Sequence, residues 1–224
     1  MIISLYLLIK DFCAFKESNE ATTKLIEEVI IEDNNEEDSA IDWQKLDNIN
    51  KDIIGWIKIE NTNIDYPILK DDDNLKYLNR SYDGKYNKNG SIFTLDNSPF
   101  QDNETIIYGH NMKSGIMFSE LSKYMKKDFY DKHKYFIIYT KDCNYKATIF
   151  SCYSIGIDEE ENNIKLLDFE EKIEYYKKTS IFSKEENIGE IKKIVKLSTC
   201  SYLNNHTTPT DQRYYIVAKL EKID

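Results

Sequence analysis

Arginine is almost absent from this chain of 224 residues: it occurs only at Arg80 and Arg213, against 28 lysines, and the formal net charge at pH 7 is −10. The acidic balance argues against a protein that grips nucleic-acid phosphates over a broad face. Since lysine cannot replace the rigid guanidinium fork at a bidentate site, each arginine needs a specific reason. With 41% hydrophobic and 13% aromatic residues, the chain is no disordered polymer and is predicted to fold.

The chain also has no Cys-x-x-Cys pair. Its cysteines and histidines are too widely spaced for a structural zinc site, so the sequence predicts neither a metal nor a cofactor; they are Cys13, Cys143, Cys152, Cys200, His110, His133 and His206. A disulfide between Cys143 and Cys152 is disfavoured, because Cys143 falls in a turn and Cys152 lies about 20 Å away along the next strand.

No apolar run reaches the roughly 20 residues that a membrane-spanning helix needs. Residues 1–15 are largely apolar but are interrupted by Lys10 and Asp11. This segment is either a truncated signal anchor, which we favour, or a frayed apolar end. Residues 16–42 lack glycine and proline, and residues 1–42 carry a net charge of −8, which leaves −2 for the rest of the chain. This composition predicts that residues 16–42 form a solvated acidic spacer with a short helix near residues 25–30.

The folded domain is expected to span residues 43–224. Apolar residues recur at three- and four-residue spacing from Trp43 to Ile54 and predict an amphipathic helix that ends near Gly55. Further helical patterns occupy residues 75–78, 117–126 and 168–179. Strand-like runs lie at residues 56–59, 64–69, 91–95, 105–108, 135–139, 145–155, 191–197 and 214–220. Many short strands without regular strand–helix alternation favour a mainly β fold, a closed or nearly closed β-barrel.

Three residues with catalytic chemistry fall where strands meet loops. Cys200 directly follows an apolar strand, His110 lies in the loop after another, and Arg213 begins a third. Each alone is more often an ordinary side chain, but a barrel can bring three strand ends into one site. Together they fit a cysteine acyl transferase or peptidase, in which a thiolate attacks a carbonyl, a histidine transfers protons and a fixed cation stabilises the oxyanion.

At these residues the sequence resembles the sortases, cysteine transpeptidases that attach proteins to the cell wall of Gram-positive bacteria, and most closely those of class B. The resemblance covers roughly residues 43–224 in the order His strand, Cys strand, Arg strand. The matching segments are Thr105-Ile106-Ile107-Tyr108-Gly109-His110-Asn111-Met112, Leu197-Ser198-Thr199-Cys200 and Arg213-Tyr214-Tyr215-Ile216-Val217-Ala218-Lys219. Lys196 stands where the family usually has threonine, which is expected to alter the edge of the strand without removing a catalytic group.

The resemblance implies a closed eight-stranded barrel with helices at the amino terminus and a helix, at residues 168–179, in the long connection before the Cys strand. It implies cleavage of a C-terminal sorting signal of surface proteins after its threonine, a thioester on Cys200 and transfer to an amine of peptidoglycan. By this resemblance His110 is the general acid and base, and Arg213 holds the substrate carbonyl. The implied location is the extracellular face of a Gram-positive cell membrane.

The remaining assignments are secondary. Ser198 and Thr199 are expected to line the substrate groove, while Asn111 and Tyr108 either support the substrate or serve in loop capping and barrel packing. The acidic clusters at residues 71–73 and 158–161 are interpreted as solvated loops, His206 as a loop residue near the site and His133 as a surface residue. Two alternatives stay open: a hydrolase that uses water as acceptor, and a non-catalytic barrel that binds cell-wall peptides.

Overall fold

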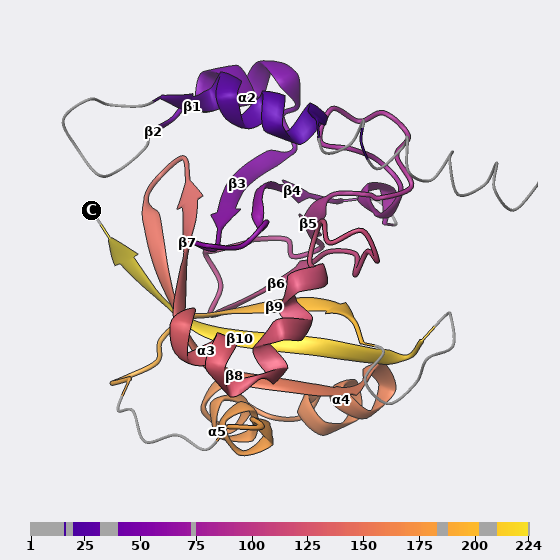
Figure 1. The fold of residues 1–224 in the computed structure, drawn as a ribbon. Helices are drawn as coiled ribbons and strands as arrows, with labels where there is room; N and C mark the ends of the chain where they lie inside the picture. Colours follow the sequence, from indigo (N-terminus) through magenta and orange to yellow (C-terminus); the bar gives the residue numbers. More distant parts are fainter. Residues whose placement is uncertain are drawn as a thin grey trace, which may run out of the picture.

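Eight strands close into a barrel in the computed structural model, which describes residues 16, 20–31, 40–72, 75–182, 188–201 and 210–223. The strand order is β10-β8-β7-β3-β4-β5-β6-β9, with β9 pairing back onto β10 (Figure 1). The predicted mainly β fold and closed eight-stranded barrel are therefore confirmed. The strands are β3 (Ile53–Lys58), β4 (Asp65–Lys70), β5 (Ile92–Thr94), β6 (Glu104–Tyr108), β7 (Tyr135–Thr140), β8 (Asn144–Gly156), β9 (Ile194–Cys200) and β10 (Gln212–Ile223).

Helices lie at the periphery of the barrel. They are α2 (Trp43–Ile49), the 3-10 helices η1 (Lys76–Leu78) and η2 (Ser119–Met125), α3 (Lys127–Lys132), α4 (Ile157–Ile164) and α5 (Phe169–Thr179). Helices α4 and α5 both belong to the connection between β8 and β9 and lie beside β8 (Figure 1). Helix α5 confirms the helix predicted at residues 168–179, and a capping box between Asp168 and Glu171 fixes its start.

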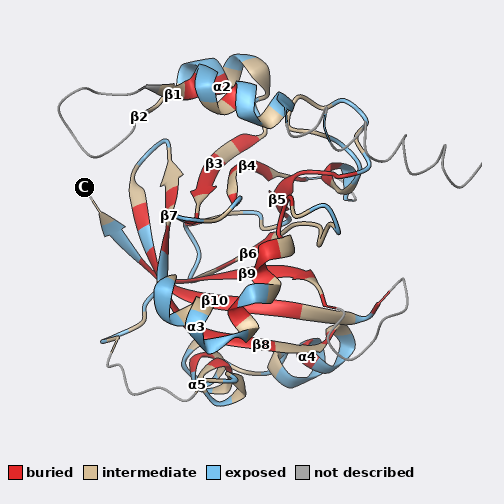
Figure 2. Ribbon diagram, viewed as in Figure 1, coloured by how far each residue is buried: buried red, intermediate tan, exposed pale blue. Residues whose placement is uncertain are grey.

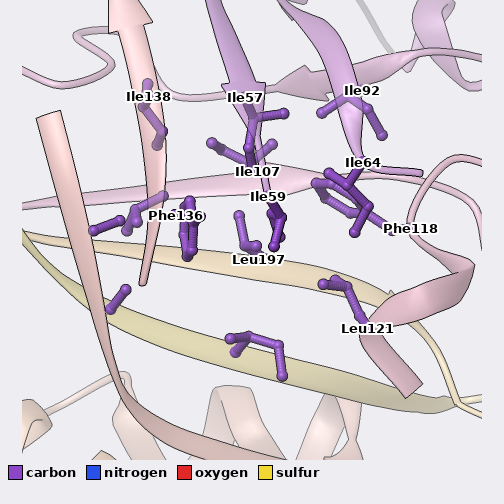
Figure 3. Packing of buried hydrophobic residues seen from close by; sticks show 14 of the residues in the cluster. Ile57, Ile59, Ile64, Ile92, Ile107, Phe118, Leu121, Phe136, Ile138 and Leu197 are labelled. Carbon is purple, nitrogen blue, oxygen red and sulfur yellow. The ribbon is translucent and has the colours of Figure 1, made fainter. Parts of the chain in front are cut away.

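The barrel interior is filled by aliphatic and aromatic side chains. Ile57, Ile107, Ile138 and Leu197 are fully buried there and face one another from four different strands (Figure 3). Because side chains alternate along a strand, the residues between them point to the outside of the barrel. A separate buried cluster, which includes Tyr176 of α5, covers part of that outer face. Figure 2 shows that the buried residues are concentrated on the strands.

The helix predicted from Trp43 to Ile54 is too long. Helix α2 ends at Ile49, Asn50 adopts an extended backbone, and β3 runs from Ile53 through Gly55. The apolar residues on either side of this turn keep a helical spacing by coincidence, since Ile53 belongs to a strand. Gly55 does not end a helix: it lies inside β3, where an added Cβ would come within 3.2 Å of the Tyr139 carbonyl oxygen.

The two acidic clusters are not simple solvated loops. Asp71 is buried, and its carboxylate accepts a hydrogen bond from the backbone N–H of Tyr77 at 3.0 Å. Residues 158–161 belong to helix α4, and Glu160 is buried in an ion pair. The sequence prediction was wrong here because it treated each acidic run as a unit, whereas single members of each run have specific partners.

Part of the expected spacer packs against the barrel. Residues 20–29 are helical, which confirms a helix in this region, and Leu25 and Val29 are buried in one cluster with Leu46 and Trp56. Strands β1 (Ile30–Ile31) and β2 (Ala40–Ile41) then pair antiparallel. Residues 20–29 are therefore not a solvated spacer, while the domain boundary at residue 43 stays a prediction. Within the residues described, no helix is long and apolar enough to span a membrane.

We expect Leu25→Ala to lower the free energy of unfolding by about 2–4 kcal/mol, because it opens a cavity between the helical segment and the barrel. Chemical denaturation followed by tryptophan fluorescence measures this change. The neighbouring exposed residue provides the control, since Lys24→Ala should change the stability by less than about 0.5 kcal/mol. Equal stability of the Leu25 variant and the wild type would mean that the segment is not part of the folded domain.

Candidate active site

The three candidate catalytic residues lie at neighbouring strand ends. Strand β9 pairs antiparallel with β10, where Cys200 is the register partner of Arg213, and parallel with β6, where Ser198 is the partner of Tyr108. His110 follows Tyr108 by two residues, as Cys200 follows Ser198. The hydrogen bond from the Gly109 N–H to the Ser198 carbonyl, at 3.2 Å, continues this pairing beyond β6. The ladder therefore brings His110, Cys200 and Arg213 to one end of three adjacent strands.

His110 is held by two hydrogen bonds at the start of its loop. Its backbone carbonyl accepts from the Phe118 N–H at 2.9 Å, and its ring Nε2 lies 2.8 Å from the carbonyl oxygen of Leu78. Because a carbonyl oxygen can only accept, Nε2 must carry a hydrogen in this arrangement. The other ring nitrogen, Nδ1, is therefore the one that can accept and return a proton.

Cys200 ends strand β9 and is half-buried. The side-chain amide of Asn111 donates a hydrogen bond to the Cys200 carbonyl at 2.6 Å, which ties the histidine loop to the backbone of the cysteine. One residue earlier, the buried Thr199 hydroxyl donates to the Gly109 carbonyl at 2.7 Å. Two hydrogen bonds thus lock the loop that carries His110 onto the strand that carries Cys200.

Arg213 provides the cation of the site. One of its terminal nitrogens, Nη1, donates to the carbonyls of Thr210 and Gln212, both at 2.9 Å. Among the described residues Arg213 has no carboxylate partner, so its remaining N–H groups are not committed to an ion pair. A guanidinium held on one side and unpaired on the other suits a carbonyl oxygen that gains negative charge.

A groove of about 590 Å³ joins the three residues. Its floor includes Tyr108, Ser198 and Tyr215, which are register partners across β6, β9 and β10. Most of the remaining lining is apolar and comes from α4 and from the segments around η1 and β5, namely Ile157, Ile164, Leu75, Leu78, Phe93 and Leu95. The groove is therefore an open channel with a row of polar residues along its floor and mostly apolar walls.

The residues expected to bind substrate divide into two groups. Tyr108, Ser198 and Thr199 line the groove, whereas Asn111 is not part of the lining and bonds to Cys200. Burial, together with the negative charges of Asp96 and Glu104, raises the pKa of Tyr108 to about 12, so its phenol keeps its proton at neutral pH. Substrate binding by these residues stays a prediction.

A buried ion pair lies at the side of the groove. The Lys196 ammonium is 3.0 Å from Glu160 Oε1, and the two side chains are only 2% and 3% exposed. Glu160 also accepts hydrogen bonds from the hydroxyls of Tyr153 at 2.6 Å and Tyr175 at 2.9 Å. Lys196 was expected to alter a strand edge, but β9 has neighbours on both sides and so presents no edge.

The ion pair continues into a second one farther from the groove. The Tyr176 hydroxyl lies 3.3 Å from the Lys196 ammonium and donates to Glu104 at 2.8 Å, and Glu104 also binds Lys172 at 2.8 Å. Although burial alone would raise the pKa of the Glu104 carboxyl, the nearby Lys196 and Lys172 charges lower it overall. Each carboxylate in this network thus has its own lysine: Glu160 pairs with Lys196, and Glu104 with Lys172.

The other histidines and cysteines lie outside this arrangement. His206 falls outside the described residues. His133 is half-buried rather than on the surface, since its ring stacks on Phe129 with the ring centroids 4.0 Å apart. Cys143 and Cys152 do not form a disulfide with each other, in agreement with the sequence analysis. No group of three potential metal ligands occurs within the described part of the chain.

Sequence reasoning missed three contributors to the site. The backbone carbonyl of Leu78 orients His110, and a main-chain atom carries no sequence signal. Glu160 was treated as one member of a solvated acidic run, and Lys196 was expected only to alter the edge of its strand. The signal that could have identified the pair is a lysine between Val195 and Leu197 in the middle of a predicted barrel strand, because a charge that is buried there requires a partner.

Comparison with known proteins identifies relatives of the chain. A family model described as the Sortase domain matches residues 57–221. The protein named Sortase B from Listeria monocytogenes is 39% identical over 168 residues, which cover 73% of this chain and 67% of that protein. Sortase B from Staphylococcus aureus is 33% identical over 189 residues, which cover 81% of this chain and 75% of that protein.

Solved structures agree with the sequence matches. Sortase B from Bacillus anthracis, in complex with AAEK1, superposes with a TM-score of 0.76 at 28% identity and covers 95% of this chain and 100% of that one. The sortase B–substrate complex from Staphylococcus aureus gives a TM-score of 0.71 at 30% identity, with 81% and 85% of the two chains covered.

Gly109 provides a test of the packing that places His110. An added Cβ would lie 2.5 Å from Ile92 Cδ1 and 2.8 Å from a ring carbon of Phe118, so Gly109→Ala should destabilise the fold by about 1–3 kcal/mol through overpacking. Scanning calorimetry measures the change. In the control Gly156→Ala, the nearest atom is the flexible Gln212 amide at 3.3 Å, and only a small shift is expected. A Gly109 variant as stable as this control would contradict the tight packing.

Proposed function

The chain belongs to the sortase family of cysteine transpeptidases, with class B enzymes among its relatives, and we propose that it cleaves the sorting signal of surface proteins after a threonine and joins the new end to an amine of peptidoglycan. In this proposal the Cys200 sulfur attacks the threonine carbonyl. His110 gives a proton to the departing amine, and a thioester on Cys200 remains. The acceptor amine then attacks the thioester, and His110 takes the proton released from that amine as the thiolate leaves.

The observation that supports this proposal most directly is the shared strand register of the three residues. Cys200 and Arg213 are register partners, and the hydrogen bond that extends the pairing of β6 with β9 leads into His110. A carbonyl bound above Cys200 would therefore lie beside a fixed cation that stabilises its developing negative charge. The Leu78 carbonyl keeps one hydrogen on Nε2 of His110, so proton transfer runs through Nδ1.

The groove supports a peptide as the substrate. Its apolar walls are suited to side chains of an extended chain, while Tyr108 and Ser198 supply hydroxyl groups along the floor toward Cys200. We propose that these two residues contact the peptide. Thr199 and Asn111 are proposed to act through the loop instead, since their hydrogen bonds go to the backbone of Gly109 and Cys200.

The proposed partners follow from the same chemistry. They are the sorting-signal peptides of surface proteins and an amine of a peptidoglycan precursor or cross-bridge. The proposed location is the extracellular face of a Gram-positive cell membrane, with the amino-terminal residues 1–15 as the tether. Neither a metal nor a cofactor takes part in the proposed steps.

The proposal predicts cleavage of a quenched peptide that carries a family-type sorting signal. Addition of a glycine or diaminopimelate peptide should yield a ligated product, identified by mass spectrometry, and Cys200→Ala should abolish both reactions. Cleavage without any ligated product would leave a hydrolase. Absence of cleavage by the wild type would favour a non-catalytic peptide-binding barrel, and activity of the Cys200 variant would refute this residue as the nucleophile.

Arg213→Lys should lower kcat about 10²- to 10³-fold. The Arg213 guanidinium donates to two backbone carbonyls through Nη1 and still has other N–H groups for the oxyanion, whereas the single ammonium of lysine cannot do both. Steady-state kinetics with the same peptide measures this. The chain offers a matched control in its only other arginine: Arg80 is exposed and binds the Gly84 carbonyl in a loop, so Arg80→Lys should retain kcat within about twofold. Equal rates for both variants would remove Arg213 from the mechanism.

A further inference from the structure

Two buried charged residues line the active-site groove without taking part in the proposed chemistry, beside the exposed Glu161. They are Lys196 and Glu160, and both are almost completely buried. Lys196 lies on the same face of β9 as Ser198 and Cys200, because residues two and four apart along a strand point the same way. Glu160 lies on α4, which supplies one wall of the groove. The ion pair therefore connects the strand of the nucleophile to the wall that faces the substrate.

Helix α4 has few other anchors: the Ile157 N–H donates to the Asp211 carbonyl at 3.0 Å, the Asn163 amide donates to the Tyr175 hydroxyl at 3.3 Å, and Ile164 packs against the buried cluster that contains Tyr176. Of its eight residues, all within the described chain, Glu160 alone is buried, and Ile157 and Ile164 are only half-buried along the groove. No side chain caps the N-terminus of the helix. A short surface helix is usually held by an apolar stripe. In α4 the only buried side chain is instead a carboxylate, that of Glu160.

The carboxylate is well suited to the role because every contact that it makes is directional. Glu160 receives the Lys196 ammonium and the hydroxyls of Tyr153 and Tyr175. The ammonium in turn lies over the rings of Tyr176 and Tyr215, 5.0 Å and 4.9 Å from their centroids. Loss of one partner would leave the other charge buried and unpaired, which is far more costly than replacing both by neutral groups.

We propose that the Lys196–Glu160 ion pair is a positioning device for the substrate peptide: it fixes α4 against β9 and so sets the width of the groove between Ile157 and Ile164 on one side and the floor on the other. The pair touches neither the scissile bond nor the three catalytic residues. Removal of one partner should weaken peptide binding and leave the chemical step nearly intact, because the other charge stays buried and unpaired. This effect on catalysis rests on the proposed function, whereas the effect on α4 does not.

The test compares Lys196→Met with the double variant Lys196→Met/Glu160→Gln. The single variant leaves a buried carboxylate unpaired, so KM for the sorting-signal peptide should rise about tenfold while kcat changes less than about twofold. Hydrogen exchange should accelerate in residues 157–164 but not in α5. The double variant removes both charges, so it should recover most of the wild-type KM and of the α4 protection.

Lys172→Met is the matched control, because Lys172 pairs with Glu104 in the same network but does not line the groove. It should leave KM and the exchange of α4 unchanged. Unchanged α4 exchange in Lys196→Met would overturn the positioning role whatever the kinetics show. An unchanged KM, or an equal rise in KM for Lys172→Met, would overturn its effect on binding. Lack of any cleavage by the wild type would count against the proposed function alone, and the exchange data would still decide the role of the pair.

Discussion

The site depends on the pairing of β9 with a strand on each side. Its parallel pairing with β6 and its antiparallel pairing with β10 fix Cys200 beside Arg213 and next to the loop of His110. A slip of one residue in either ladder would turn the cysteine from the groove toward the barrel interior. Such a slip is opposed by the inner face of β9, where Val195 and Leu197 are fully buried in the barrel core. The packing that stabilises the barrel therefore also positions Cys200, the proposed nucleophile.

The outer face of the same strand must satisfy different requirements along its length. At Cys200 it ends in a half-buried site, but at Lys196 it is covered by the helical connection, where water cannot solvate a charge. The alternation of β9 places the lysine on this covered face, and α4 and α5 supply the groups that make it tolerable there, Glu160 and Tyr176. The connection before the Cys strand thus links β8 to β9 and also covers the outer face of β9.

Much of this arrangement was predictable from the sequence, and the parts that were not share a cause. The strand pattern predicted a barrel, and the positions of Cys200, His110 and Arg213 beside strands predicted their convergence, because strand periodicity and strand ends are local signals. The end of α2 was misplaced since Ile53 and Ile54 fit a helical spacing yet belong to β3. Burial of Glu160 and the role of the Leu78 carbonyl depend on contacts between distant segments, which periodicity does not encode.

Charge placement explains how an acidic chain retains a usable cation in its groove. The net charge of −10 includes −8 from residues 1–42, so the barrel itself is nearly neutral. In the groove Glu160 is paired with Lys196, while Glu104, farther from it, is paired with Lys172. Because Glu160 has its own lysine, it does not need Arg213, and among the described residues the guanidinium binds only backbone carbonyls. Glu161 also lines the groove but is exposed to solvent, whereas an unpaired buried carboxylate there would compete with a substrate carbonyl for that cation. Lys196 therefore contributes to the site indirectly, because its pairing with Glu160 leaves Arg213 available for the contact that we propose with the oxyanion.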